Sequence, residues 1–210
     1  MILEGNPLRS RWRWAEPEAH ATPEPSDVRD RDPFVRGGAQ RGETRCGRAE
    51  TPWGDLCVVW SRSTLLDFSF EDSASAIDAE SSHGPLRTRG LIDAGMPVDD
   101  AGAQAWADLW IGCGPNLPDG VRFAVDGTPF QCRVWRALMR IPRGTVTSYG
   151  RLAAVLGMPR AARAVGAACG ANRLALWVPC HRVVRDSGEI HGYRWGVARK
   201  ESVLAWEAGL

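Results

Sequence analysis

The sequence predicts a mixed α/β fold with a small α/β domain at residues 46–126 and a mostly helical domain at residues 127–210. Three observations support this prediction. Alternating apolar runs between residues 56 and 70 are typical of strands. Apolar residues recur at helical spacing in several segments between residues 101 and 171. A chain of 210 residues suits one or two domains and can bury a sizeable core.

Residues 1–45 are predicted to form a disordered arm. Charges of both signs alternate there without an apolar period, and five prolines interrupt any helix. Trp12 and Trp14 lie among arginines and could touch DNA, although a tail that packs locally or not at all is the simpler interpretation. The N-terminus lacks the apolar core of a signal peptide, and no apolar run approaches the roughly 18 residues of a membrane span. We therefore expect a soluble, intracellular protein.

The first domain is predicted to begin with a β-hairpin. Leu56–Trp60 and Leu66–Phe70 are the expected strands, joined by a loop at Ser61–Thr64, and the second strand places Leu66, Phe68 and Phe70 on one face. Residues 71–100 are rich in Ser, Asp and Gly and give no clear pattern. A helix is expected from Ala101 to Ile111, ended by Gly112, followed by a short strand at Val121–Val125.

The second domain shows stronger local signals. Thr128 to Gln131 form a capping box with Pro129 at the first helical position, and an apolar stripe follows. Thr147 or Ser148 can cap a second helix that ends at Gly157. A third helix is expected from Arg160 to about Ala171. Two short helices joined by a tight glycine turn indicate either a helix-turn-helix or a plain helical hairpin.

The third helix consists almost entirely of alanine and glycine. Small side chains allow a close approach to a neighbouring helix or to DNA, and the sequence leaves both open. Arg163 is the one long side chain among them. It could enter a base stack or groove, or be an ordinary surface arginine.

Charge is distributed unevenly along the chain. Residues from Thr128 onward carry 13 Lys and Arg against 4 Asp and Glu, whereas residues 1–127 carry 13 against 21. A basic C-terminal part is expected of a polyanion-binding protein, or it is simply a solvated basic face. Among those 13 basic residues only Lys200 is a lysine, a bias that favours nucleic acid because arginine binds phosphate and stacks on rings.

Cys180 is the candidate nucleophile. It follows the strand-like apolar run Leu176–Val178 and Pro179, which would place it at a bend facing a cleft, and His181 is next to it. The alternative is a buried structural cysteine. The six cysteines are irregularly spaced with no Cys-x-x-Cys pair, which argues against a zinc site or a disulfide framework and favours reduced thiols.

A series of motifs in the second half resembles a known family. They are Phe130-Gln131, Val134-Trp135, Ile141-Pro142-x-Gly144, Ser148-Tyr149-Gly150, Ala162-Arg163-Ala164-Val165-Gly166, Asn172, Pro179-Cys180-His181-Arg182-Val183 and Gly192-Tyr193-Arg194-Trp195-Gly196. In order and spacing these motifs resemble the O6-alkylguanine-DNA alkyltransferases, also called methylated-DNA–protein-cysteine methyltransferases, above all the C-terminal half of bacterial Ada-type members. The resemblance covers Thr128 to Glu207, and the residues from about Thr51 loosely resemble the family's N-terminal domain.

The resemblance implies chemical roles for five residues. Cys180 would accept the alkyl group from O6 of a damaged guanine. His181 would draw the thiol proton through a water, and Glu207 would orient that histidine. Asn172 would tie the recognition helix to the cysteine loop. Tyr149 would help to turn the nucleotide out and donate a hydrogen bond to the extruded base.

The resemblance also implies a set of DNA contacts. Arg163 would fill the place that the extruded base leaves in the stack. Four further residues are expected at the DNA, namely Ser148, Ala164, Gly166 and Arg182.

Fold, partners and location follow from the same resemblance. It implies a ribonuclease H-like N-terminal domain and a winged helix-turn-helix C-terminal domain. The implied activity is the irreversible transfer of a methyl or alkyl group from O6-alkylguanine in double-stranded DNA to the protein itself, once per molecule and with base flipping. No cofactor, metal or membrane is expected, and we expect a monomer in a bacterial-type cytoplasm acting on the nucleoid.

Two departures and two alternatives accompany this interpretation. The chain lacks the four-cysteine zinc domain of full Ada-type regulators, so neither methylphosphotriester repair nor a transcriptional switch is inferred. His191 stands where a small residue is expected, which affects the shape of the alkyl pocket. The alternatives are a non-catalytic protein that flags lesions, although Cys180 argues against it, and a Cys-His-Glu hydrolase, which would leave the basic helix-turn-helix unexplained.

Overall fold

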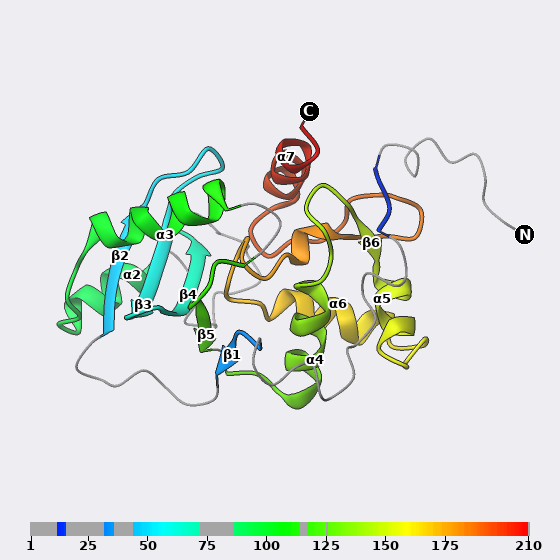
Figure 1. The fold of residues 1–210 in the computed structure, drawn as a ribbon, viewed down its shortest axis with the longest axis horizontal. Coiled ribbons are helices and arrows are strands. Elements are labelled where there is room, and N and C mark those ends of the chain that lie inside the picture. The colour runs from blue at the N-terminus through cyan, green and yellow to red at the C-terminus, as the bar shows by residue number, and fades with distance from the viewer. Residues whose placement is uncertain are drawn as a thin grey trace, which may run out of the picture. The chain divides into compact units, whose positions relative to one another are not determined.

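The computed structural model describes residues 12–15, 32–35, 44–71, 86–113, 117–124 and 126–209. These residues belong to two compact units (Figure 1). The sheet unit lies within residues 27–126 and also includes residues 173–177. The helical unit lies within residues 1–26, 127–172 and 178–210. The mixture of a sheet with several helices confirms the predicted α/β class.

A five-stranded sheet forms the centre of the sheet unit, in the order β1-β5-β4-β3-β2. Its strands are β1 (Phe34–Val35), β2 (Thr44–Ala49), β3 (Leu56–Ser61), β4 (Thr64–Phe70) and β5 (Arg122–Ala124). Strand β3 is antiparallel to β2 and β4, and β5 is parallel to β4 and β1. The predicted hairpin is confirmed with a shorter loop, and the predicted strand at Val121–Val125 is found as β5, with Val125 outside the described residues.

The predicted alternation along β4 is wrong at Leu66. A β-bulge shifts the register between β3 and β4, so that Trp60 pairs with Leu65 while Val59 pairs with Asp67. One extra residue on a strand turns the following side chains to the other face. Leu65 is therefore fully buried, and Leu66 packs on the other side against a cluster of Cys46, Cys57 and Val59.

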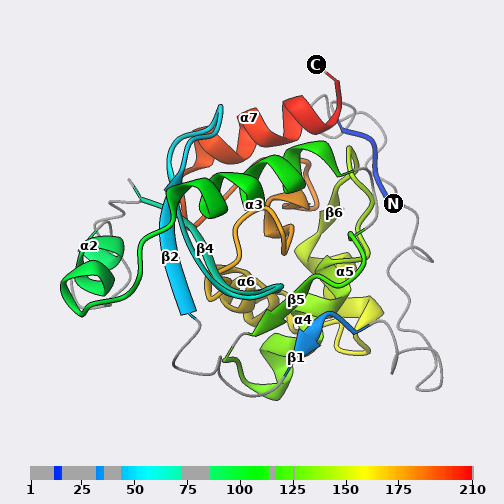
Figure 2. The same ribbon diagram turned by 60° about the vertical axis from the view of Figure 1, so that its left-hand side comes forward.

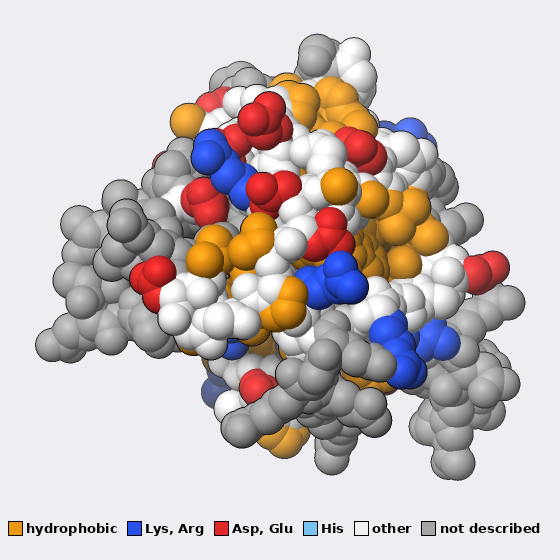
Figure 3. Space-filling model, turned by 90° about the vertical axis from the view of Figure 1, so that its left-hand side faces the viewer, with side chains coloured by type: hydrophobic (Ala, Val, Ile, Leu, Met, Phe, Trp, Pro, Cys, Tyr) orange, Lys and Arg blue, Asp and Glu red, His pale blue; other side chains and the backbone are white. Residues whose placement is uncertain are grey.

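Among the described residues of the sheet unit, two helices accompany the sheet, α2 (Leu86–Asp93) and α3 (Asp100–Gly112). Helix α3 confirms the helix predicted at residues 101–111, and Figure 2 shows it lying across the sheet, where it contacts β2 and β3. Its buried face carries Ala103, Trp106 and Trp110, and the Asp99 side chain caps its N-terminus by accepting a hydrogen bond from Gly102 N at 2.8 Å. Figure 3 shows hydrophobic, acidic and basic side chains interspersed on the side of the molecule that carries these elements.

Residues 173–177 leave the helical unit and join the sheet unit. Phe68 N donates to Arg173 O at 3.0 Å, and Ala175 N donates to Phe68 O at 2.6 Å. The predicted strand-like run at Leu176–Val178 is wrong, because these residues form turns in which Leu176 has a φ of 67°. Trp177 packs on the rings of Phe68 and Phe123 instead.

Four helices and two short strands make up the described helical unit. They are α4 (Pro129–Leu138), β6 (Thr147–Ser148), α5 (Tyr149–Val155), α6 (Ala162–Gly170), β7 (Val183–Val184) and α7 (Val197–Glu207). The predicted capping box of Thr128 and Gln131 is confirmed, and so is the cap by Ser148. Helix α6 starts two residues later than expected and packs against both α4 and α5. The Trp135 indole donates to Ala168 O at 2.9 Å, so a neighbouring helix is one partner of the small-residue surface.

The expected disordered arm needs correction in three stretches. Trp12 is buried in a cluster with Val146, Val184 and Leu204, and the backbone of residues 13–15 pairs with Val146. Phe34–Val35 form β1, and β2 already begins at Thr44. Aromatic side chains and sheet pairing order these stretches although the surrounding composition is polar. No helix in the described ranges is long and apolar enough to cross a membrane.

Candidate active site

A cavity of about 460 Å³ opens in the helical unit. Helices α5 and α6 supply one part of its wall, and the residues before and after β7 supply the rest. Cys180 is part of the lining together with Tyr149, Arg163 and Cys169, and the loop His191–Arg194 completes it. A volume in this range suits a small organic ligand.

Cys180 begins a short 3₁₀ turn, Cys180–Arg182, directly after Pro179. The Asn172 side chain holds this turn: its Nδ2 donates to Val178 O at 2.8 Å and lies 3.3 Å from Cys180 Sγ. Burial raises the pKa of the Cys180 thiol, although the hydrogen bond from Asn172 and the charge of Lys200 oppose that rise. The resting sulfur is therefore a neutral thiol, which must lose its proton before it can act as a nucleophile.

His181 is fully buried beside Cys180 in the chain, and a carboxylate orients it. His181 Nε2 lies 3.0 Å from Glu207 Oε1. Burial lowers the pKa of His181, while the charge of Glu207 raises it in part. The imidazole is consequently neutral near pH 7. Within the part of the chain that the structure describes, His181 Nδ1 has no hydrogen-bond partner, so this nitrogen can accept a proton.

Arg182 fixes the carboxylate from the other side. Its Nε and Nη2 donate to Glu207 Oε2 and Oε1 at 2.9 and 2.6 Å, and its Nη1 donates to Ile141 O at 2.6 Å. Burial alone would raise the pKa of Glu207, but the charges and hydrogen bonds of His181 and Arg182 lower it well below the ordinary value. Glu207 thus stays ionised and holds the histidine tautomer that protonates Nε2.

Gly144 allows the chain to pass close behind this carboxylate. Its φ is +73°, and a Cβ there would meet Glu207 O at 2.8 Å. Gly144 N also lies 3.4 Å from Glu207 Oε2. Both the backbone conformation and the close approach require glycine at the turn after α4.

Tyr149 stands at the start of α5 and faces the cavity. Its hydroxyl donates to His191 O at 3.3 Å. Burial raises the pKa of Tyr149 above its ordinary value, so the hydroxyl remains a hydrogen-bond donor. His191, which departs from the expected small residue, lines the cavity and contributes its carbonyl to this contact.

Comparison with known proteins decides the family. Residues 129–209 match the model of the DNA-binding domain of 6-O-methylguanine DNA methyltransferases. A methylated-DNA–protein-cysteine methyltransferase of Mycobacterium bovis is 51% identical over 161 residues, which are 75% of this chain and 88% of that relative. The chain belongs to the methylated-DNA–protein-cysteine methyltransferase family. The predicted resemblance is thereby confirmed.

Solved structures of the methyltransferase family agree in fold. The chain is 34% identical to the O6-methylguanine methyltransferase of Mycobacterium tuberculosis, with a TM-score of 0.61 over 79% of this chain and 93% of that one. The structure of the Mycobacterium tuberculosis protein in complex with DNA gives 32% identity and a TM-score of 0.62. The regulatory protein Ada of Salmonella typhimurium is 57% identical over 84 residues, so the chain spans only 24% of that longer relative.

The structure buries two of the residues that are expected to contact DNA in this methyltransferase-family chain. Ser148 is fully buried: its hydroxyl caps α5 by accepting from Arg151 N at 3.1 Å and donates to the Asp186 carboxylate. Arg182 is 9% exposed and is held by Glu207. Both side chains therefore have internal partners, and their expected contact with DNA stays a prediction.

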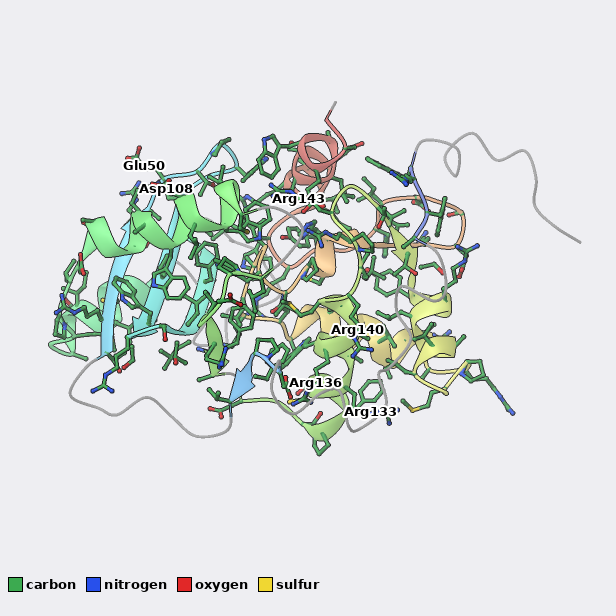
Figure 4. The ribbon with its side chains drawn as sticks, in the orientation of Figure 1. Glu50, Asp108, Arg133, Arg136, Arg140 and Arg143 are labelled. Carbon is green, nitrogen blue, oxygen red and sulfur yellow. The ribbon has the colours of Figure 1, made fainter. Side chains whose placement is uncertain are left out.

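The other expected DNA contacts lie on α6. Arg163 and Ala164 are exposed, and Gly166 is half-buried with the Tyr149 ring 3.8 Å from the position of a Cβ. Arg163 and Gly166 line the cavity, whereas Ala164 does not. The helical unit carries further arginines: Figure 4 shows Arg133 and Arg136 of α4 and Arg140 shortly after its end.

Sequence reasoning missed one residue of the site. Lys200 of α7 is fully buried, and its Nζ donates to Val183 O at 2.5 Å and to His191 O and Gly192 O at 3.3 and 3.2 Å. The sequence did contain a sign of this residue's importance, because Lys200 is the only lysine in the chain. The described residues contain no group of three or more His, Cys, Asp or Glu that could hold a metal ion.

Proposed function

We propose that this protein repairs O6-alkylguanine in double-stranded DNA by moving the alkyl group to its own Cys180. The main observation in support of the proposal is the arrangement of three residues. The Cys180 thiol lines the cavity, and the neutral His181 next to it is oriented by the Glu207 carboxylate. A relative named methylated-DNA–protein-cysteine methyltransferase, of which this chain covers 88%, supports it.

The proposed reaction begins with removal of the thiol proton. His181 Nδ1 accepts that proton through a water, and Glu207 stabilises the imidazolium that forms. The thiolate sulfur then attacks the alkyl carbon, so an S–C bond forms while the C–O6 bond breaks. The purine that leaves takes up a proton, which the His181 imidazolium formed in the first step returns through water, and Tyr149 is the proposed hydrogen-bond donor to the extruded base.

The product explains why each molecule would act once. A thioether at Cys180 is stable, because a histidine, a carboxylate or a neutral thiol does not displace the alkyl group from its sulfur. The protein is therefore consumed in proportion to the lesions that it repairs. This stoichiometry distinguishes the proposal from a hydrolase that shares the same three residue types.

DNA binding would use the α5–α6 pair. The helices are joined by a turn at Gly157, which has a φ of +74°, and α6 presents Arg163 beside the cavity. We assign Arg163 to the space that the flipped nucleotide leaves in the stack. The finer fold description, a ribonuclease H-like sheet unit and a winged helix-turn-helix unit, is part of this proposal, and the monomeric state and cytoplasmic location stay predictions.

A stoichiometric repair assay tests the proposal. A duplex with a single O6-methylguanine is mixed with increasing amounts of protein, and restored guanine is measured at completion. We expect one guanine restored per protein molecule and none with Cys180→Ser. Continued turnover, or tight lesion binding by the wild-type protein without any restored guanine, would refute the proposal.

A further inference from the structure

Lys200 stands out by its residue type and by its position. The sequence contains 26 Lys and Arg residues, and Lys200 is the only lysine among them. It is also fully buried in α7, although charged side chains are rarely buried without a partner of opposite charge. Arginine cannot lose its proton in a protein, whereas the compact ammonium group of lysine adjusts to burial.

Its hydrogen bonds tie together three parts of the candidate site. One goes to Val183 in β7, directly after the turn that carries Cys180 and His181. The other two go to His191 and Gly192, which line the cavity. The Tyr149 hydroxyl donates to the same His191 carbonyl, and Lys200 Nζ lies 5.9 Å from the centre of the Tyr149 ring. All three protons of the ammonium group are thus engaged by carbonyl oxygens, and two of these belong to residues that line the cavity.

The charge of Lys200 has no carboxylate to balance it. Among the described residues, no Asp or Glu oxygen lies within 4.0 Å of its Nζ. Ionisable groups from several elements surround this part of the helical unit. The helices contribute Tyr149 of α5, Cys169 of α6 and Glu207 of α7, and the 3₁₀ turn contributes Cys180 and His181. The cavity loops contribute Arg185, His191, Tyr193 and Arg194. Burial lowers the pKa of Lys200 to about 8, and ionised Cys180 and Cys169 would raise it. The groups whose ionisation couples to the charge of Lys200 include the two thiols, which attract it when ionised, and His181, which repels it when protonated.

We propose that Lys200 is a positioning residue for the transfer, whose buried ammonium group fixes the His191–Gly192 wall of the cavity and is the counter-charge of the Cys180 thiolate as it forms. The inference rests on the proposed function and deepens it. An uncompensated buried cation costs free energy in the resting protein, and that cost is relieved when a negative charge appears nearby. The attacking state of the site thereby gains stability relative to its resting state.

The first test uses the reactivity of Cys180 with iodoacetamide as a function of pH. We expect Lys200→Met to raise the apparent pKa of the Cys180 thiol by about one unit and to slow its alkylation about tenfold near neutral pH. Above the thiol pKa the rates of variant and wild type should converge. Lys200→Arg should restore the wild-type pH profile in large part, because it restores the charge. Arg199→Met, the neighbouring cation on the same helix, is the matched control and should leave the profile unchanged.

A parallel loss of rate at every pH, or no loss, would overturn the proposal. The reaction with iodoacetamide needs no DNA, so its outcome does not depend on the repair assay. If the wild-type protein fails to repair DNA while the profile shifts as expected, the proposed function fails and the coupling between Lys200 and Cys180 stands.

A second test needs no substitution and so avoids any failure of folding. Because the chain has a single lysine, protein grown with isotope-labelled lysine gives one side-chain NMR signal, whose pH titration reports Lys200 alone. Methylating Cys180 removes the thiol's ability to ionise. We expect the titration midpoint of Lys200 to fall after methylation, since its coupled negative partner is lost. An unchanged midpoint would contradict the proposed pairing.

Discussion

Replacing Arg182 with methionine separates two roles for this residue, a DNA contact and an internal support for Glu207. Arg182 donates two hydrogen bonds to the Glu207 carboxylate, at 2.9 and 2.6 Å, and a third to Ile141 O at 2.6 Å. The Glu207 side chain is fully buried, and that of Arg182 is 11% exposed. The substitution therefore leaves a buried carboxylate with His181 as its remaining side-chain partner among these contacts.

The expected cost follows from this burial. Removing one member of a buried ion pair typically costs about 3–5 kcal/mol, because the other charge is left without compensation. For a chain of this size, each kcal/mol lowers the melting temperature by about 2–4 °C. We expect Arg182→Met to lower the melting temperature by about 6 °C or more. The double variant Arg182→Met/Glu207→Gln should recover part of that loss, because it removes the unpaired charge.

Two measurements on the same preparations check this prediction. Differential scanning calorimetry gives the melting temperature, and fluorescence anisotropy with an unmodified duplex gives the DNA affinity. We expect a large loss of stability with DNA affinity within about twofold of wild type at a temperature where the variant is folded, an affinity difference below about 0.5 kcal/mol. A drop in DNA affinity of tenfold or more at unchanged melting temperature would refute the structural role and restore the DNA contact.

Three further predictions address proton removal by His181 and Glu207, the insertion of Arg163 into the base stack, and the pH dependence of stability. Glu207→Gln should slow alkyl transfer in single-turnover assays while duplex affinity stays near normal. An unchanged rate would contradict the role of Glu207 in orienting His181. Arg163→Ala should slow the repair of duplex DNA more than the reaction with free O6-benzylguanine. Equal losses of rate would contradict the insertion of Arg163 into the base stack. The folded chain holds His181 and Glu207 at lowered pKa values, so it binds fewer protons than the unfolded chain in acid, and the free energy of unfolding should fall as pH drops below 6.5 and further below 4.5. The free energy of unfolding is measured by chemical denaturation at each pH, and a constant value below pH 6.5 would contradict the lowered pKa values of His181 and Glu207.

Local signals in the sequence were sufficient for much of the helical unit. The capping box at Thr128 and the cap at Ser148 depend only on residues three positions apart, and both occur as predicted. The motif around Cys180 and the offset of Glu207 identified His181 and Glu207 as a pair, and in the structure His181 Nε2 lies 3.0 Å from Glu207 Oε1. Such features depend on short spacings or on a known family pattern, so one sequence can reveal them.

Contacts between distant segments could not be predicted in the same way. Arg182 was assigned to DNA because its motif says nothing about Glu207, 25 residues further along, or about the Ile141 carbonyl. Trp12 belongs to a stretch of polar composition, yet it is buried against Val146 and Leu204. The bulge at Leu66 depends on pairing with β3 and not on β4 alone. In each case the deciding partner is remote in the sequence and leaves no local pattern.

Intact-mass analysis of the protein after incubation with a duplex containing O6-methylguanine tests the central claim most directly. We expect the wild-type protein to gain the mass of one methyl group in place of one hydrogen, and peptide mapping to place it on Cys180. The Cys180→Ser variant should show no gain. An unchanged mass for the folded wild-type protein, or a methyl group mapped to another residue, would contradict the assignment of Cys180 as the alkyl acceptor.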